Sequence, residues 1–109
     1  MKIPSKIRIG GQEIMIEMPK HLPDNKLGDI CVAGGKIRIA KKFLDYEQSE
    51  TSMINTFIYE VVHGVLDTMG EFELSENEKF VSPFASLMVN VIEEIVKVNK
   101  EECINDKSE

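Results

Sequence analysis

The residues with the clearest chemical pattern are Tyr59, Glu60 and His63, which occur in the order Tyr-Glu-Val-Val-His. This order differs by one residue from the pattern H-E-x-x-H, in which two histidines one helical turn apart bind zinc and the glutamate activates a zinc-bound water. A helix places residues 59 and 63 on one face, with residue 60 beside them. The pattern therefore makes Glu60 a candidate general base and makes Tyr59 and His63 candidate metal ligands.

A third metal ligand would have to come from another segment, and Glu78 in the next predicted helix is the natural candidate. Ser75 and Glu78 also have the S-x-x-E spacing of a helix capping box, which explains both residues without a metal. A histidine on an apolar helix is most often a hydrogen-bonded side chain, and a tyrosine there is most often a packed aromatic. Spacing alone therefore favours a structural role for all of these residues.

Two long helices are expected to carry the candidate residues. Residues 47–69 repeat apolar side chains at i, i+3 and i+4, and Gly70 stands where a helix commonly ends. The capping box opens a second helix at Ser75, with an apolar stripe that continues to residue 96. Pro83 leaves two interpretations open, because it either kinks this helix or lies near a true start at Ser82.

Two β-hairpins are expected before the helices. Residues 6–9 and 13–18 alternate polar and apolar side chains around Gly10-Gly11, and residues 28–33 and 36–40 flank Gly34-Gly35. We expect the hairpins to form one small antiparallel sheet packed on two long C-terminal helices, which is an α+β fold. Residues 1–100 are expected to be a single domain, and residues 101–109 a polar, frayed tail.

Composition restricts the classes of partner. The net charge is -6, with 19 acidic and 13 basic residues, so no nucleic-acid partner is expected. No apolar run is long enough for a membrane helix, and no membrane partner is expected. Cys31 and Cys103 belong to no C-x-x-C motif, and no secretory signal opens the sequence. We therefore expect a cytoplasmic protein with reduced thiols.

Four stretches, taken in order, resemble a family of small phage and prophage proteins that are zincin-like and related to the ImmA/IrrE metallopeptidases: KIRIGGQEIMIEM, DNKLGDICVAGGKIRIAKKF, FIYEVVHGVLDTMG and LSENEKFVSPFASLM. The resemblance covers residues 2–96. In ImmA/IrrE-like proteins, a segment E-x-x-A-[ND]-x-F-A follows H-E-x-x-H, and its glutamate is the third metal ligand. Residues 78–85 fit that frame, with Val81 and Ser82 at the positions of the small and amide residues.

The resemblance implies a zincin-like fold with Glu60 as catalytic base, His63 and Glu78 as zinc ligands, and Tyr59 in place of the first histidine. It also implies that residues 36–40 form a sheet edge that receives an extended substrate. A phenol must lose a proton of pKa about 10 before it binds zinc well. Tyr59 therefore either weakens a zinc site or replaces the metal in a hydrogen-bonded network with His63 or Glu78, and we favour the second interpretation.

Three functional hypotheses follow. The leading one is a cytoplasmic phage- or prophage-type zincin-like domain whose metallopeptidase site is degenerate, and which acts by binding or regulating an unknown protein or peptide partner. The alternative is an active zinc metallopeptidase with Glu60 as general base. The third is a structural module that oligomerises through the Met- and Val-rich helix faces of residues 84–96.

Overall fold

The computed structural model describes the backbone of residues 1–108 and the side chains of residues 1–98. Residues 1–108 form six strands and three α-helices, with a 3-10 turn at Pro23–Asn25. The strands are β1 (Lys6–Ile9), β2 (Gln12–Glu17), β3 (Gly28–Cys31), β4 (Lys36–Ile39), β5 (Lys42–Phe43) and β6 (Tyr46–Glu47). The helices are α1 (Glu50–Thr68), α2 (Phe72–Ser75) and α3 (Glu78–Ser108). The α+β class is therefore confirmed.

The four longer strands form one sheet in the order β1-β2-β4-β3. Both predicted hairpins are present, because β1 pairs antiparallel with β2 and β3 pairs antiparallel with β4. The hairpins join through β2 and β4, which run parallel with Ile16 opposite Ile37. The prediction of a wholly antiparallel sheet was therefore wrong, and the sheet is mixed.

Burial explains why β4 lies inside the sheet. Ile37 and Ile39 point to the same face and are completely buried, whereas Ile30 of β3 is partly exposed. A strand with paired neighbours on both sides gives such side chains the most complete burial. The prediction that residues 36–40 form a sheet edge was therefore wrong, and β1 and β3 are the edge strands.

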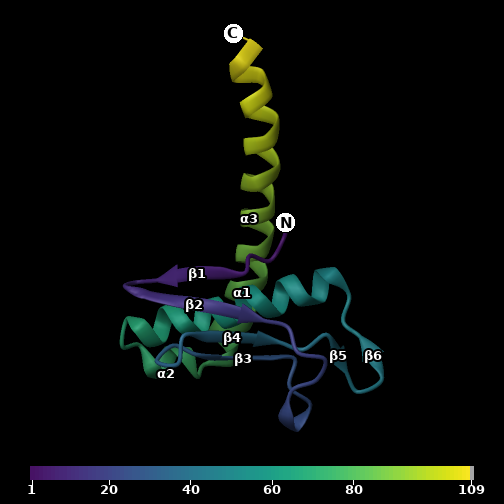
Figure 1. Ribbon diagram of the computed structural model, residues 1–109. Helices are drawn as coiled ribbons and strands as arrows, with labels where there is room; N and C mark the ends of the chain where they lie inside the picture. Colours follow the sequence, from purple (N-terminus) through teal and green to yellow (C-terminus); the bar gives the residue numbers. More distant parts are fainter. Residues whose placement is uncertain (109) are drawn as a thin grey trace.

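Helix α1 lies against one face of the sheet and begins later than predicted (Figure 1). Its N-cap is Ser49, whose hydroxyl accepts a hydrogen bond from the Ser52 N–H at 3.1 Å. Gly64 allows the close approach to the sheet, since a Cβ there would lie 2.5 Å from Ile30 Cδ1. Buried apolar residues from both layers form one core: Ile9, Ile14, Ile37, Ile39, Ile54, Phe57, Ile58, Val62, Leu66, Val81, Ala85 and Val89.

Helix α3 begins at Glu78 rather than at Ser75 or Ser82. Asn77 precedes it, and the Asn77 side-chain oxygen accepts a hydrogen bond from the Lys79 N–H at 3.1 Å. Ser75 instead ends the short helix α2, so the capping-box prediction was wrong. Pro83 lies inside α3.

Helix α3 packs on α1 and α2 and then extends away from the rest of the molecule (Figure 1). Its helical backbone continues to Ser108. The predicted polar tail at residues 101–109 includes residue 109 and side chains that lie outside the described part of the chain. Its fraying therefore stays a prediction.

Candidate functional site

The site predicted from the sequence is assembled from α1 and the start of α3. The Tyr59 hydroxyl lies 2.6 Å from each carboxylate oxygen of Glu78, to which it donates its proton. The rings of Tyr59 and His63 lie one helical turn apart and meet edge to face, with centroids 4.6 Å apart. Three of the four predicted residues are therefore neighbours, and Tyr59 contacts both His63 and Glu78.

The imidazole of His63 is held between two side chains. Its Nδ1 lies 3.0 Å from the Ser75 hydroxyl oxygen, and its Nε2 lies 3.8 Å from a carboxylate oxygen of Glu78. Ser75 is buried, which strengthens its contact with the ring. Sequence reasoning missed Ser75 as a site residue because the capping-box spacing already accounted for it.

The phenol of Tyr59 is held in its protonated form. Burial of the side chain, the hydrogen bond to Glu78 and the nearby charges of Glu78 and Glu60 raise the pKa of the Tyr59 hydroxyl well above its usual value. At neutral pH the hydroxyl is thus a neutral donor to the Glu78 carboxylate. Zinc would require the opposite state, a phenolate whose proton has been lost.

Glu60 is buried, with 6% of its surface exposed. The pKa of the Glu60 carboxyl is raised to about 7, mainly by burial and to a smaller extent by the negative charges of Asp29 and Glu78. The nearby positive charge of Lys26 opposes this rise. A carboxyl that titrates close to neutral pH can accept or donate a proton, which is the behaviour required of a general acid or base.

Glu60 and Tyr59 line an open groove of about 660 Å³ between the start of β3, the first half of α1 and the start of α3. Its remaining lining is mostly small or hydroxyl-bearing: Lys26, Leu27, Gly28, Ser49, Thr51, Ser52, Asn55, Thr56, Ser82, Ala85 and Ser86. Gly28 keeps the strand close to α1, since a Cβ there would lie 2.6 Å from Thr56 Cγ2 and 3.3 Å from a Glu60 carboxylate oxygen.

His63 opens onto a different hollow of about 570 Å³, which it shares with Glu78, Ser75 and Asp67. The hydrogen-bonded pair of Tyr59 and Glu78 contributes one residue to each hollow. The candidate base and the candidate imidazole ligand therefore do not line one common cavity. This separation is the main difference from the arrangement expected for an H-E-x-x-H site.

The edge strand β3 begins at the groove, which Gly28 lines. The Ala40 N–H donates to the Leu27 carbonyl at 2.9 Å, and Gly28 and Ile30 follow opposite Ile39 and Ile37. Paired and unpaired positions alternate in an antiparallel ladder, so the backbone groups of Gly28 and Ile30 point away from β4. The edge beside the groove thus offers free backbone donors and acceptors, on a different strand from the one predicted.

The donors at the predicted metal position are fewer than a catalytic zinc site uses. Such sites have three protein ligands and one open position. Here His63 and Glu78 are the two conventional donors, and the third candidate, Tyr59, is a protonated phenol bonded to Glu78. Within the described side chains, no three His, Cys, Asp or Glu residues are grouped so that they could hold a metal ion. As it stands, this donor set does not fit a conventional zinc site.

Comparison with known proteins gives no relative. No family model matches the sequence, and neither the curated proteins nor the solved structures contain a match. Among the helices of the described chain, none combines the length and the apolar character needed to cross a membrane.

Proposed function

We propose that this chain is a zincin-like domain of phage or prophage type in which a hydrogen-bonded network takes the place of the catalytic metal. The proposal rests on the Tyr59 hydroxyl, which lies 2.6 Å from both oxygens of Glu78 and contacts the ring of His63. The tyrosine thus engages the two residues that would otherwise bind a metal. In this proposal the domain is catalytically impaired and acts by binding or regulating a protein or peptide partner.

The groove beside β3 is the proposed binding surface. An extended peptide segment could pair with the free backbone groups of Gly28 and Ile30, as peptides add to exposed sheet edges in other proteins. Its side chains would then meet Glu60 and the hydroxyls of the groove. Because Glu60 is buried, it favours a donor or a positive charge in the bound segment.

Zinc content tests the metal-free part of this proposal. The protein is purified without added metal or chelator, and its zinc is measured by mass spectrometry before and after incubation with zinc. We expect no stoichiometric zinc. About one equivalent per chain, lost in both His63→Ala and Glu78→Ala but retained in the control Glu73→Ala, an exposed glutamate outside this hollow, would contradict the proposal.

The second candidate function is an active zinc peptidase with Glu60 as base, His63 and Glu78 as ligands and Tyr59 as a possible third ligand. The observation that favours it is the raised pKa of Glu60 at the bottom of an open groove. In this candidate His63, Glu78 and Tyr59 would hold the zinc, which would polarise a substrate carbonyl and activate a water. Hydrolysis of an unstructured protein such as casein, abolished by Glu60→Gln and unchanged by Glu73→Gln, would establish this candidate and exclude the first.

A further inference from the structure

Helix α3 carries a row of exposed apolar residues that no other part of the described chain covers. The five residues are large, and between 41% and 63% of the surface of each is exposed: Phe84, Leu87, Val91, Ile95 and Val98. The row is about 21 Å long at the rise of an α-helix. Glu94 borders the row, and no charged residue lies within it.

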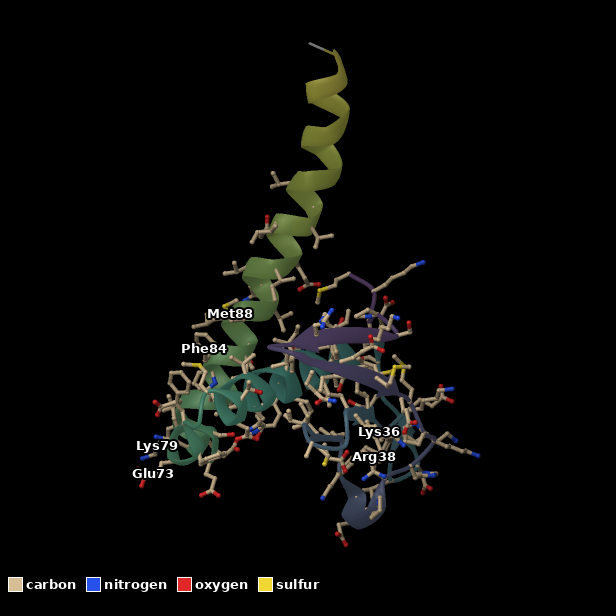
Figure 2. The ribbon with its side chains drawn as sticks, turned by 60° about the vertical axis from the view of Figure 1, so that its left-hand side comes forward. Lys36, Arg38, Glu73, Lys79, Phe84 and Met88 are labelled. Carbon is tan, nitrogen blue, oxygen red and sulfur yellow. The ribbon has the colours of Figure 1, made fainter. Side chains whose placement is uncertain are left out.

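This row is separate from the face of α3 that packs on the body of the protein. The body-facing residues are Val81, Ala85 and Val89, all buried, whereas Phe84 and Val91 point to a neighbouring side of the helix. Figure 2 shows Phe84 on the side of α3 that is turned away from the four-stranded sheet, whereas Met88, which is not in the row, packs partly against the core. The exposed row therefore adds nothing to the core of a single chain.

The outer part of α3 has little support from the described part of the chain. Val89 is the last buried residue and Ile92 the last that packs against the core, yet the helical backbone continues to Ser108. Isolated helical segments of this length are marginal in water, because most helix stability comes from packing of an apolar face. A second surface packed on the row would supply the missing contacts.

The spacing of the row is symmetric about Val91. Residues 84 and 98 each lie seven positions from Val91, and residues 87 and 95 each lie four positions from it. In an antiparallel pair of identical helices centred on Val91, Phe84 meets Val98, Leu87 meets Ile95 and Val91 meets itself. Every exposed apolar residue of the row then faces another one, as a two-fold interface between identical chains requires.

We propose that α3 is a homodimerisation helix, and that the row of residues 84, 87, 91, 95 and 98 packs antiparallel against the same row of a second copy of this chain. The two bodies then lie at opposite ends of the helix pair, because each body is attached to the N-terminal half of its own α3. The α3 residues that line the groove at Glu60 are Ser82, Ala85 and Ser86, none of which belongs to the row, so the groove stays open in this dimer.

Sedimentation analysis of the full chain over a range of concentrations tests the association. We expect the mass to rise from 12.4 kDa, the value for one chain, to twice that value. Val91→Glu should stay at the mass of one chain, because two carboxylates would meet at the symmetry axis. The matched control Asn90→Glu places the same charge one residue away, on another side of the helix, and should still dimerise.

Both substituted positions are exposed, so the circular dichroism spectrum of each variant should match that of the wild type. A wild-type chain that keeps the mass of one chain at all concentrations overturns the proposal. Association that survives Val91→Glu, or that is lost equally in Asn90→Glu, also overturns it.

Disulfide cross-linking tests the antiparallel orientation. In a background of Cys31→Ser and Cys103→Ser, one chain carries Leu87→Cys and a second, distinguishable by mass, carries Ile95→Cys. Mixing and mild oxidation should yield mainly the mixed disulfide, because a disulfide requires neighbouring backbones and positions 87 and 95 oppose each other. Predominance of cross-links between identical positions would indicate a parallel pair and would overturn the antiparallel dimer.

Discussion

At the scale of single residues, one side chain separates the two candidate functions. Tyr59 has the position of a metal ligand in the H-E-x-x-H pattern, but its hydroxyl is a neutral donor to Glu78. A histidine at the same position would present a nitrogen lone pair instead of a proton. The chemistry of the site thus depends on which of the two side chains stands at position 59.

Tyr59→His is expected to create a zinc site. The new imidazole would join His63 and Glu78, which already lie within 3.8 Å of each other, and complete the usual set of three protein ligands. Calorimetric titration with zinc should show one site per chain in this variant and none in the wild type. Tyr59→Phe is the control; it should bind no zinc and should lower the free energy of unfolding by about 1 kcal/mol through loss of the bond to Glu78.

If Tyr59→His folds but binds no zinc, then Glu78 does not face His63 in solution, and the proposal that Tyr59 takes the place of a metal at a zincin-like site is contradicted.

Glu60 is expected to make stability depend on pH. Its pKa is about 7 in the folded protein, compared with a reference value of 4.5. Between these values the unfolded chain loses the proton while the folded chain keeps it, so the free energy of unfolding falls as pH rises. The shift corresponds to a loss of about 3 kcal/mol between pH ~5 and pH ~8, at about 1.4 kcal/mol per pKa unit.

Urea denaturation of the wild type and of Glu60→Gln at both pH values measures this effect. The neutral amide cannot titrate, so the difference between the two proteins should grow in favour of Glu60→Gln as pH rises. A wild-type stability that changes with pH no more than that of the variant would contradict the prediction.

At the scale of elements, the local signals in the sequence predicted more than the long-range ones. The Gly-Gly turns located both hairpins, and the apolar stripe of residues 47–69 located α1 to within a few residues. The order of the strands could not be obtained in this way, because alternation within a strand does not specify its neighbour. The short strands β5 and β6 were not predicted, because two residues give almost no periodic signal, and β6 ends at Glu47, where the predicted helix began.

The candidate site shows the same difference between local and long-range signals. The neighbourhood of Tyr59, His63 and Glu78 followed from helical spacing and from the resemblance, and the structure brings these side chains together. The partner of His63 did not follow, since Ser75 reaches the ring only because α2 turns the chain back toward α1. The position of Glu60 beside the β3 edge also depends on the strand order, which the sequence left undetermined.

The crossing of α1 over the sheet provides a test at this scale. Gly64→Val should lower the free energy of unfolding by about 2 kcal/mol, because its side chain would enter space held by Ile30 and Ile9. Asn55→Val is the matched control on the same helix at an exposed position, and it should change stability by less than about 0.5 kcal/mol. Urea denaturation measures both. Equal effects in the two variants would mean that α1 does not lie this close to β3.

At the scale of the whole molecule, the chain has a small body with one helix extending far from it (Figure 1). The sequence predicted an apolar stripe on this helix but did not distinguish the side that packs on α1 from the exposed row. Both follow a helical repeat, and only the tertiary contacts of Val81, Ala85 and Val89 identify the inner side. The groove and the exposed row therefore become separate surfaces only once the fold is known.

Dimerisation through α3 should make thermal stability depend on concentration. Association that occurs only in the folded state stabilises that state by mass action. The wild-type midpoint of thermal unfolding should therefore rise by several degrees with a hundredfold increase in protein concentration. The midpoint of Val91→Glu should not move, because a monomer unfolds without a change in molecularity. Asn90→Glu should follow the wild type. Since the row lies outside the core, a constant midpoint in the wild type would mean that the exposed row of α3 does not pair with itself while the protein is folded.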